Sequence, residues 1–221
     1  MFRSLIKSSP FLFFCLIIYL SIFTVLILSF DKVTIFYYVN SHFNPFFDQL
    51  FYYLTAIGNG WTYAILMIAM LFFSYRYFLM FFSALIVKTI IVQSMKYFFF
   101  PGILRPNILF KTMSGLHVVN GVDLLNYYSF PSGHSASIFC IAVLLTLIIK
   151  KDNWTILFII IAILTGYSRM YLGQHFSVDV YTGSWIGILT AYLSFWYFRL
   201  KPLGKINNIS WIDKKITFSK I

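Results

Sequence analysis

The sequence contains no glutamate, and only 10% of its 221 residues are charged. About a quarter of the residues of a typical soluble domain are charged, so this chain lacks the polar surface of that class of protein. Apolar residues make up 60% of the sequence, and the mean hydropathy is +0.83. A soluble fold of this length cannot bury so much apolar surface. The composition therefore predicts an integral membrane protein.

Acidic residues and cysteine are also scarce. Six acidic residues face 17 basic ones, and the formal net charge is +11. A nucleic-acid-binding protein would carry such an excess on a polar surface, which is missing here. The basic excess is instead expected to set membrane orientation and to contact anionic lipid or a phosphate. The two cysteines, Cys15 and Cys140, lie in apolar runs and are expected to be small buried apolar side chains.

Six apolar segments are candidates for membrane-spanning helices, because a helix needs about 20 apolar residues to cross roughly 30 Å of hydrocarbon. The predicted spans are about residues 11–30, 61–75, 78–96, 135–149, 154–171 and 180–198. No internal repeat and no low-complexity linker divides the chain. We therefore expect an all-α integral membrane protein with a single domain over residues 1–221, of which 199–221 form a basic cytoplasmic tail.

The lysines and arginines predict the orientation of these spans. With six spans, eleven basic residues fall on one side of the membrane and five on the other. The positive-inside rule then places both termini in the cytoplasm. All four histidines and four of the six aspartates fall on the outer side. The outer face is therefore where chemistry is expected.

The first outer connection, residues 31–60, is rich in aromatic residues. Asn44 followed by Pro45 is typical of a helix cap with proline at the first helical position. Phe47 and Phe51 follow at helical spacing, so an amphipathic helix lying in the membrane interface is expected. This helix either covers the bundle or guides a substrate.

The clearest chemical motif is Ser168-Arg169, followed by His175 and Asp179. Because His175 and Asp179 are four residues apart, the carboxylate can reach an imidazole nitrogen across one helical turn. A carboxylate on one ring nitrogen fixes the tautomer and leaves the other nitrogen nucleophilic. The guanidinium group of Arg169 can bind two phosphate oxygens.

Two further motifs fall on the same face. Pro131-Ser132-Gly133-His134 opens the fourth predicted span, where N–H groups favour an anion and an imidazole can protonate a leaving oxygen. Lys96 and Arg105 add two cations at the outer end of the third span. Each motif alone has an ordinary structural explanation, such as a basic residue that anchors a helix end. Together, three cations with one aspartate indicate a phosphate site, since a metal site would need more carboxylates or cysteines.

At these residues the sequence resembles the type 2 phosphatidic acid phosphatase (PAP2) superfamily. The family pattern is Lys-x6-Arg-Pro, then Pro-Ser-Gly-His, then Ser-Arg-x5-His-x3-Asp. The second and third parts match fully, whereas eight residues rather than six separate Lys96 from Arg105. The run Phe98 to Gly102 is expected to absorb the two extra residues as a loop. The longer form resembles membrane phosphatases of Bacteroidetes, some of which act on lipid A.

The resemblance implies a role for each motif. It implies that His175 attacks phosphorus, that Asp179 orients it, and that His134 protonates the leaving alkoxide and then serves as the base for water. The implied phosphate-binding residues are Lys96, Arg105, Ser132, Gly133, Ser168 and Arg169. No metal and no organic cofactor is implied.

The implied substrate is a lipid phosphate at the outer face of a bacterial inner membrane, facing the periplasm. Lipid A phosphate is favoured, and undecaprenyl diphosphate is the alternative. A phosphotransferase with the same site, and a non-catalytic lipid-phosphate binder or small channel, are the rival functions. Neither nucleic acid nor metal is expected as a partner.

Three residues outside the motifs carry an open assignment. Lys88 lies within the third predicted span, where an ionisable side chain is a functional candidate, but it can equally snorkel or face water. His117 and Asp123 lie in the second outer connection, residues 97–134, and are expected to be solvated loop residues rather than headgroup contacts.

Overall fold

The computed structural model describes residues 6–111, 116–200 and 214, and within these residues it contains helices and no strand. The α-helices are α2 (Pro10–Ser29), α3 (Lys32–Ser41), α4 (Pro45–Leu54), α5 (Gly60–Ala69), α6 (Tyr75–Ser94), α7 (Gly133–Ile149), α8 (Asp152–Tyr171) and α9 (Ser177–Phe195). Shorter helices are η1 (Thr55–Gly58), η2 (Met70–Phe72), η3 (Met95–Phe99), η4 (Pro106–Lys111) and η5 (Trp196–Leu200).

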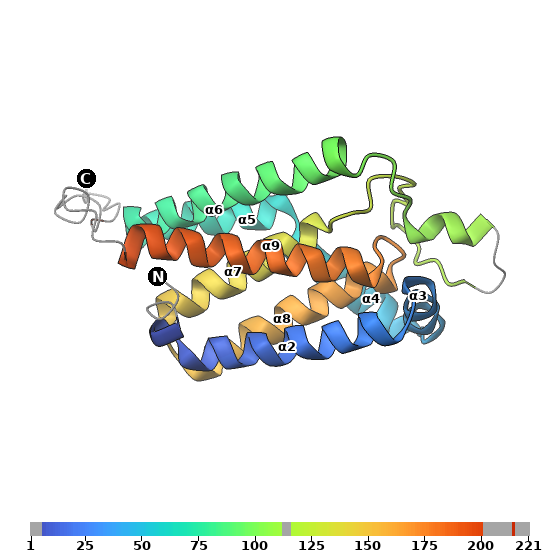
Figure 1. The fold of residues 1–221 in the computed structure, drawn as a ribbon, viewed down its shortest axis with the longest axis horizontal. Coiled ribbons are helices and arrows are strands. Elements are labelled where there is room, and N and C mark those ends of the chain that lie inside the picture. Colours follow the sequence, from blue (N-terminus) through green and yellow to red (C-terminus); the bar gives the residue numbers. More distant parts are fainter. Residues whose placement is uncertain (1–5, 112–115, 201–213, 215–221) are drawn as a thin grey trace.

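The long helices form an elongated bundle. Figure 1 shows α2, α6, α7, α8 and α9 running side by side, with both chain ends at one end of the bundle and α3 and α4 at the other. We call these the terminal end and the α3–α4 end. Helix α7 lies in the middle and is buried along most of its length. The core therefore centres on α7.

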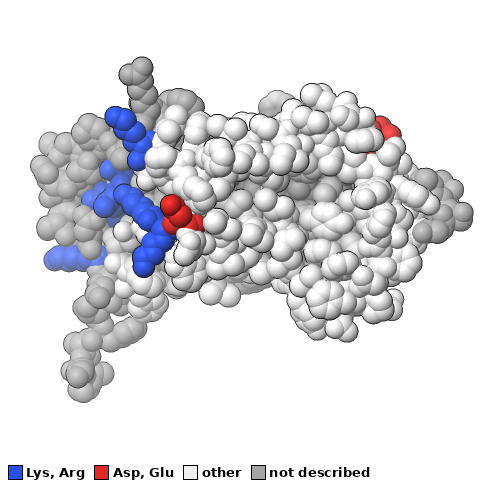
Figure 2. Space-filling model, turned by 90° about the horizontal axis from the view of Figure 1, so that it is seen from below, with Lys and Arg blue, Asp and Glu red and all other residues white. Residues whose placement is uncertain are grey.

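Several of these helices suit a membrane by length and composition. Among the described residues, α2, α8 and the stretch Tyr75–Phe99 are long and apolar enough to cross, and the bent pair Pro45–Gly58 and Gly60–Phe72 would add a fourth. Large apolar side chains face outward, including Leu28 of α2 at 81% exposed. Figure 2 shows the lysines and arginines of one face gathered at the terminal end, while the long middle part carries no charged side chain. This distribution fits a multi-pass membrane protein.

The segment 31–60 is more helical than the sequence suggested. Helix α3 was not anticipated there; Asp31 caps it by accepting hydrogen bonds from the N–H groups of Val33 and Thr34. Helix α4 begins at Pro45, and its cap Asn44 accepts from the N–H of Phe47, as the Asn-Pro pair predicts. Helix α4 then continues through η1 to α5 with a bend of 54°. It is therefore one half of a bent pair.

Two glycines let α9 lie directly on α7. A Cβ at Gly183 would lie 2.4 Å from the carbonyl oxygen of Ser132, and one at Gly187 would lie 2.4 Å from that of Ala136. Small residues four apart allow helix backbones to approach this closely inside a membrane. The backbone N–H of Ser132 also donates to the carbonyl of Asp179 at 2.9 Å. The start of α9 is thereby fixed against the start of α7.

A polar cluster ties the segment between α6 and α7 to the bundle through His117. Nε2 of His117 lies 2.8 Å from Oδ1 of Asp48, and the hydroxyl of Tyr171 donates to the same carboxylate at 2.6 Å. Asn40 is buried and bonds both the N–H and the carbonyl of His117. The prediction of a solvated His117 was therefore wrong, because α4 and α8 present partners that the sequence order does not reveal.

Candidate active site

A cavity of about 610 Å³ opens at the α3–α4 end, between the end of α6, the start of α7 and the segment that follows α8. Leu124, Leu125, Tyr127 and Tyr128 form part of its rim. The predicted site residues that line it are Lys96, Arg105, Gly133, His134, Arg169 and His175. Residues from three motifs that are distant in sequence therefore face one volume.

His175 sits in the short segment between α8 and α9 and is only 2% exposed. Its Nε2 lies 3.4 Å from Nη1 of Arg105. Because arginine can only donate, this ring nitrogen is the acceptor and carries no proton. The proton is then on Nδ1, which faces Oδ2 of Asp179 at 3.5 Å without a formed hydrogen bond. In this Nδ1-protonated tautomer, the unprotonated nitrogen Nε2 is the one that lies beside Arg105.

Asp179 is held in place from two sides. Its Oδ2 accepts a hydrogen bond from the backbone N–H of Phe176 at 2.9 Å and another from the hydroxyl of Ser129. Asp179 is 3% exposed and does not line the cavity. Its carboxylate therefore lies behind His175, where it can orient the ring but not touch a bound molecule.

The surroundings of His175 predict how its charge depends on pH. Burial lowers the pKa of the imidazole well below its ordinary range, and the Arg105, Arg169 and Lys96 cations lower it further. A lowered pKa keeps the neutral form as pH falls through about 6.5, where a free histidine gains its proton. In ¹⁵N-histidine NMR, the His175 resonances should therefore stay those of a neutral ring between pH 7.5 and 5.5. A titration midpoint near 6.5, with the signals assigned from a His175→Gln variant, would contradict this.

Arg105 and Arg169 approach the same side chain from different parts of the chain. Nη1 of Arg105 donates to the backbone carbonyl of Gln174 at 3.0 Å and to its Oε1 at 3.2 Å. Nη2 of Arg169 lies 3.5 Å from the same Oε1. Nη1 of Arg169 also donates to the hydroxyl of Thr55 at 2.6 Å. Gln174 thus bridges two guanidinium groups that would otherwise repel each other.

Lys96 reaches the cavity from a π-helical turn. Helix α6 ends at Ser94, and the next turn, η3, is wider than an α-helical turn. From there Nζ of Lys96 donates to the carbonyl oxygen of Tyr128 at 2.7 Å. The chain then reverses at Gly102, which has φ of +79°. Part of the longer Lys96–Arg105 spacing is therefore absorbed by a π-helical turn, where the sequence predicted only a loop.

The start of α7 supplies Gly133 and His134. Ser132 caps the helix by accepting from the N–H of Ser135 at 3.3 Å. The N–H groups of Gly133 and His134 have no acceptor among the described residues. They lie in the first turn of a helix, where the backbone attracts an anion.

Two predicted phosphate-binding residues lie outside the cavity lining. Ser132 and Ser168 are both 0% exposed. The hydroxyl of Ser132 accepts from that of Ser135, and the hydroxyl of Ser168 donates to the carbonyl of Thr165 at 2.7 Å. The structure therefore shows local structural bonds for both hydroxyls, while a direct phosphate contact stays a prediction.

Comparison with known proteins now gives the family. The sequence pattern described as PAP2 superfamily matches residues 76–202, which is more than half of the chain. The chain belongs to the PAP2 superfamily. All three motifs fall inside the matched range.

Individual PAP2 relatives differ in how much of the chain they cover. The lipid A 4'-phosphatase of Porphyromonas gingivalis is 26% identical over 179 residues, covering 73% of this chain and 71% of that protein. The undecaprenyl-diphosphatase of Sulfolobus acidocaldarius is 40% identical over 82 residues, but this match spans only 39% of that protein. The crystal structure of Aquifex aeolicus LpxE has a TM-score of 0.64 at 30% identity and covers 74% of this chain and 94% of that one.

Sequence reasoning missed three side chains of this PAP2 site. Ser129 holds Asp179, Gln174 joins the two arginines, and Thr55 bonds Arg169. Gln174 directly precedes His175, and Ser129 lies two residues before Pro131, so proximity to the motifs was the available signal. Thr55 is 114 residues from Arg169, so no such signal in the sequence pointed to it.

Proposed function

We propose that this chain is a membrane phosphatase that hydrolyses a phosphomonoester or diphosphate of a lipid through a phosphohistidine on His175. The observation that carries the proposal is that His175, with its Nε2 3.4 Å from Nη1 of Arg105, lines one cavity together with Lys96, Arg105 and Arg169. PAP2 membership supports the same reaction.

In the first step, Nε2 of His175 forms a bond to phosphorus as the ester P–O bond breaks. The electron pair of that bond leaves with the alkoxide, which takes a proton from the imidazolium form of His134, a form that the negative charge of the bound phosphate favours. Asp179 stabilises the charge that develops on the imidazole ring. The three cations neutralise the charge that spreads over the equatorial oxygens.

In the second step, water attacks phosphorus and loses a proton to His134. The N–P bond breaks, its electron pair returns to Nε2, and inorganic phosphate leaves. The cycle restores both histidines and consumes one water. An alcohol in place of water would give a phosphotransferase with the same residues.

For the substrate we propose a lipid A phosphate, with undecaprenyl diphosphate as the alternative. The lipid A 4'-phosphatase of Porphyromonas gingivalis matches this chain over 71% of its own length, which favours the first. The local match to an undecaprenyl-diphosphatase favours the second. We also propose that six helices span a bacterial inner membrane, N-in and C-in, with the cavity facing the periplasm. The basic residues at the terminal end support that orientation.

The test is phosphate release by the purified protein in detergent from a panel of lipid phosphates. We expect the fastest release, by kcat/KM, from lipid A phosphate. Faster release from undecaprenyl diphosphate would overturn the substrate assignment. If no lipid of the panel releases phosphate, the proposed phosphatase function is wrong. A labelled alcohol acceptor added to the same reaction measures phosphoryl transfer directly.

A further inference from the structure

Lys88 of α6 is a buried cation that the reaction above does not use. It is 7% exposed and lies in the stretch Tyr75–Phe99 that is apolar enough to cross a membrane. Its Nζ donates to the hydroxyl of Ser137 on α7 at 2.8 Å and lies 5.2 Å from the ring centroid of Tyr63. No carboxylate among the described residues pairs with it.

The position of Lys88 relates it to the cavity. Val92, one helical turn after Lys88, lines the cavity, and so does Gly133, one turn before Ser137. Val92 and Gly133 also face each other, since a Cβ on Gly133 would lie 3.8 Å from Cγ1 of Val92. The Lys88–Ser137 pair therefore crosses from α6 to α7 one turn beneath the cavity floor, or about 6 Å along the helix at 1.5 Å per residue.

A lone ammonium in this environment is costly. An ionisable side chain inside a membrane bundle loses its hydration, and one hydroxyl and one aromatic ring offset only part of that loss. An anion in the cavity would supply the missing counter-charge from above. The attraction between the ammonium group of Lys88 and an anion in the cavity, acting over about 10 Å at an effective dielectric constant of about 20, changes anion affinity by about ten-fold.

We propose that Lys88 is an electrostatic positioning residue of the phosphate site. Its charge lies beneath the cavity floor and favours the phosphate group that Lys96, Arg105 and Arg169 contact from the sides. The inference rests on the proposed phosphatase function and adds a fourth cation to its anion pocket. It assigns the effect to the charge of Lys88 rather than to its bond with Ser137.

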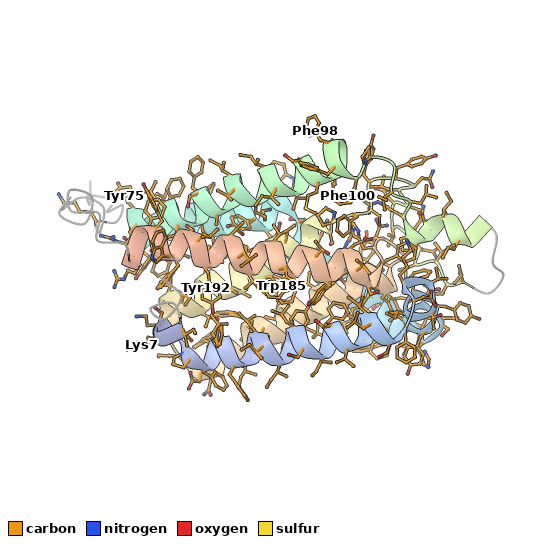
Figure 3. The ribbon with its side chains drawn as sticks, in the orientation of Figure 1. Lys7, Tyr75, Phe98, Phe100, Trp185 and Tyr192 are labelled. Atoms are coloured by element: carbon orange, nitrogen blue, oxygen red, sulfur yellow. The ribbon has the colours of Figure 1, made fainter. Side chains whose placement is uncertain are left out.

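The test compares binding of ³²P-labelled inorganic phosphate to purified variants in detergent. Lys88→Met and Lys88→Gln both remove the charge, and Lys88→Gln retains a donor for Ser137. Lys88→Arg keeps the charge, and Ser137→Ala removes only the acceptor. Lys7→Gln is the control for bulk charge, because Lys7 is exposed and Figure 3 shows it at the opposite end of the bundle from Phe98.

We expect both neutral variants to weaken phosphate binding about ten-fold, and Lys88→Arg, Ser137→Ala and Lys7→Gln to stay within about three-fold of wild type. Lys88→Met replaces a buried charge by an apolar chain of similar length, so it leaves no unpaired charge inside the bundle. Binding by Lys88→Met within two-fold of wild type would overturn the inference. So would an equal loss in Ser137→Ala, because that result would assign the effect to packing.

The same experiment separates this inference from the function it rests on. If the wild-type protein neither binds phosphate nor releases it from any lipid, the proposed function fails. If wild type does both and the neutral variants bind phosphate equally well, only the role of Lys88 fails.

Discussion

Replacement of His175 by alanine is expected to reduce phosphate release at least about 1,000-fold, because removing a catalytic nucleophile leaves only the contribution of binding and charge. The nitrogen that is lost is Nε2, which accepts from Arg105 and faces the cavity. Steady-state release from the preferred lipid phosphate measures the change. Rapid acid-free quenching with ³²P-labelled substrate should show label on wild-type protein and none on the variant.

Folding must be separated from chemistry in this variant. Arg105 keeps its bonds to the carbonyl and the side chain of Gln174 when the imidazole is removed, so its guanidinium group is not left without acceptors. His175→Gln fills more of the space and tests the same loss with a smaller cavity. His42→Ala is the matched control, because His42 is an exposed helix cap of α3 outside the cavity lining. A well-folded His175→Ala protein with wild-type release would disprove the nucleophile assignment.

Replacement of His134 by alanine is expected to lower release from a lipid phosphate about 100- to 10,000-fold, the usual range for losing a general acid or base. An alkoxide leaves poorly without a proton. 4-Nitrophenolate needs no proton to leave, so the first step of the variant should be nearly normal with 4-nitrophenyl phosphate. Hydrolysis of the phosphohistidine still lacks its base. We therefore expect a burst of one nitrophenolate per protein, followed by slow turnover and accumulated ³²P-phosphohistidine.

This burst distinguishes the two histidines. His175→Ala should give neither burst nor label with the activated substrate. If the burst rate of His134→Ala falls as far as its rate with the lipid, then His134 acts before the leaving group departs, for example by binding the phosphate. In that case the acid–base role is wrong although the cavity position stands.

Much of the site was accessible from local sequence pattern. The Ser132 cap before α7 depends on neighbours in the chain and appears in the structure. The spacing of His175 and Asp179 brings Nδ1 within 3.5 Å of Oδ2, although His175 precedes α9 and no hydrogen bond is formed. Helix α4 also begins at the Asn44-Pro45 cap. Helix α3 was missed although Asp31 caps it and the buried residues Ile35, Phe36 and Val39 follow helical spacing, because a helix of ten residues is too short to stand out as a membrane span.

The partners that complete the site come from distant parts of the chain. Ser129 and Asp179 are 50 residues apart, and His117 and Asp48 are 69 apart. Such contacts depend on which helices pack together and at what distance. No periodicity within one segment carries that information.

Composition and local spacing alone reveal the membrane character, the family motifs and the two histidines and three cations that line the cavity, because these features depend on neighbouring residues of the chain. The packing of the helices shows in addition that Lys96 reaches the cavity from a π-helical turn and that Gln174 bridges Arg105 and Arg169. It also placed Lys88 beneath the cavity floor, joined to Ser137. These contacts depend on how distant helices pack, as where Gly183 and Gly187 let α9 lie directly on α7 and bring Asp179 beside the start of α7.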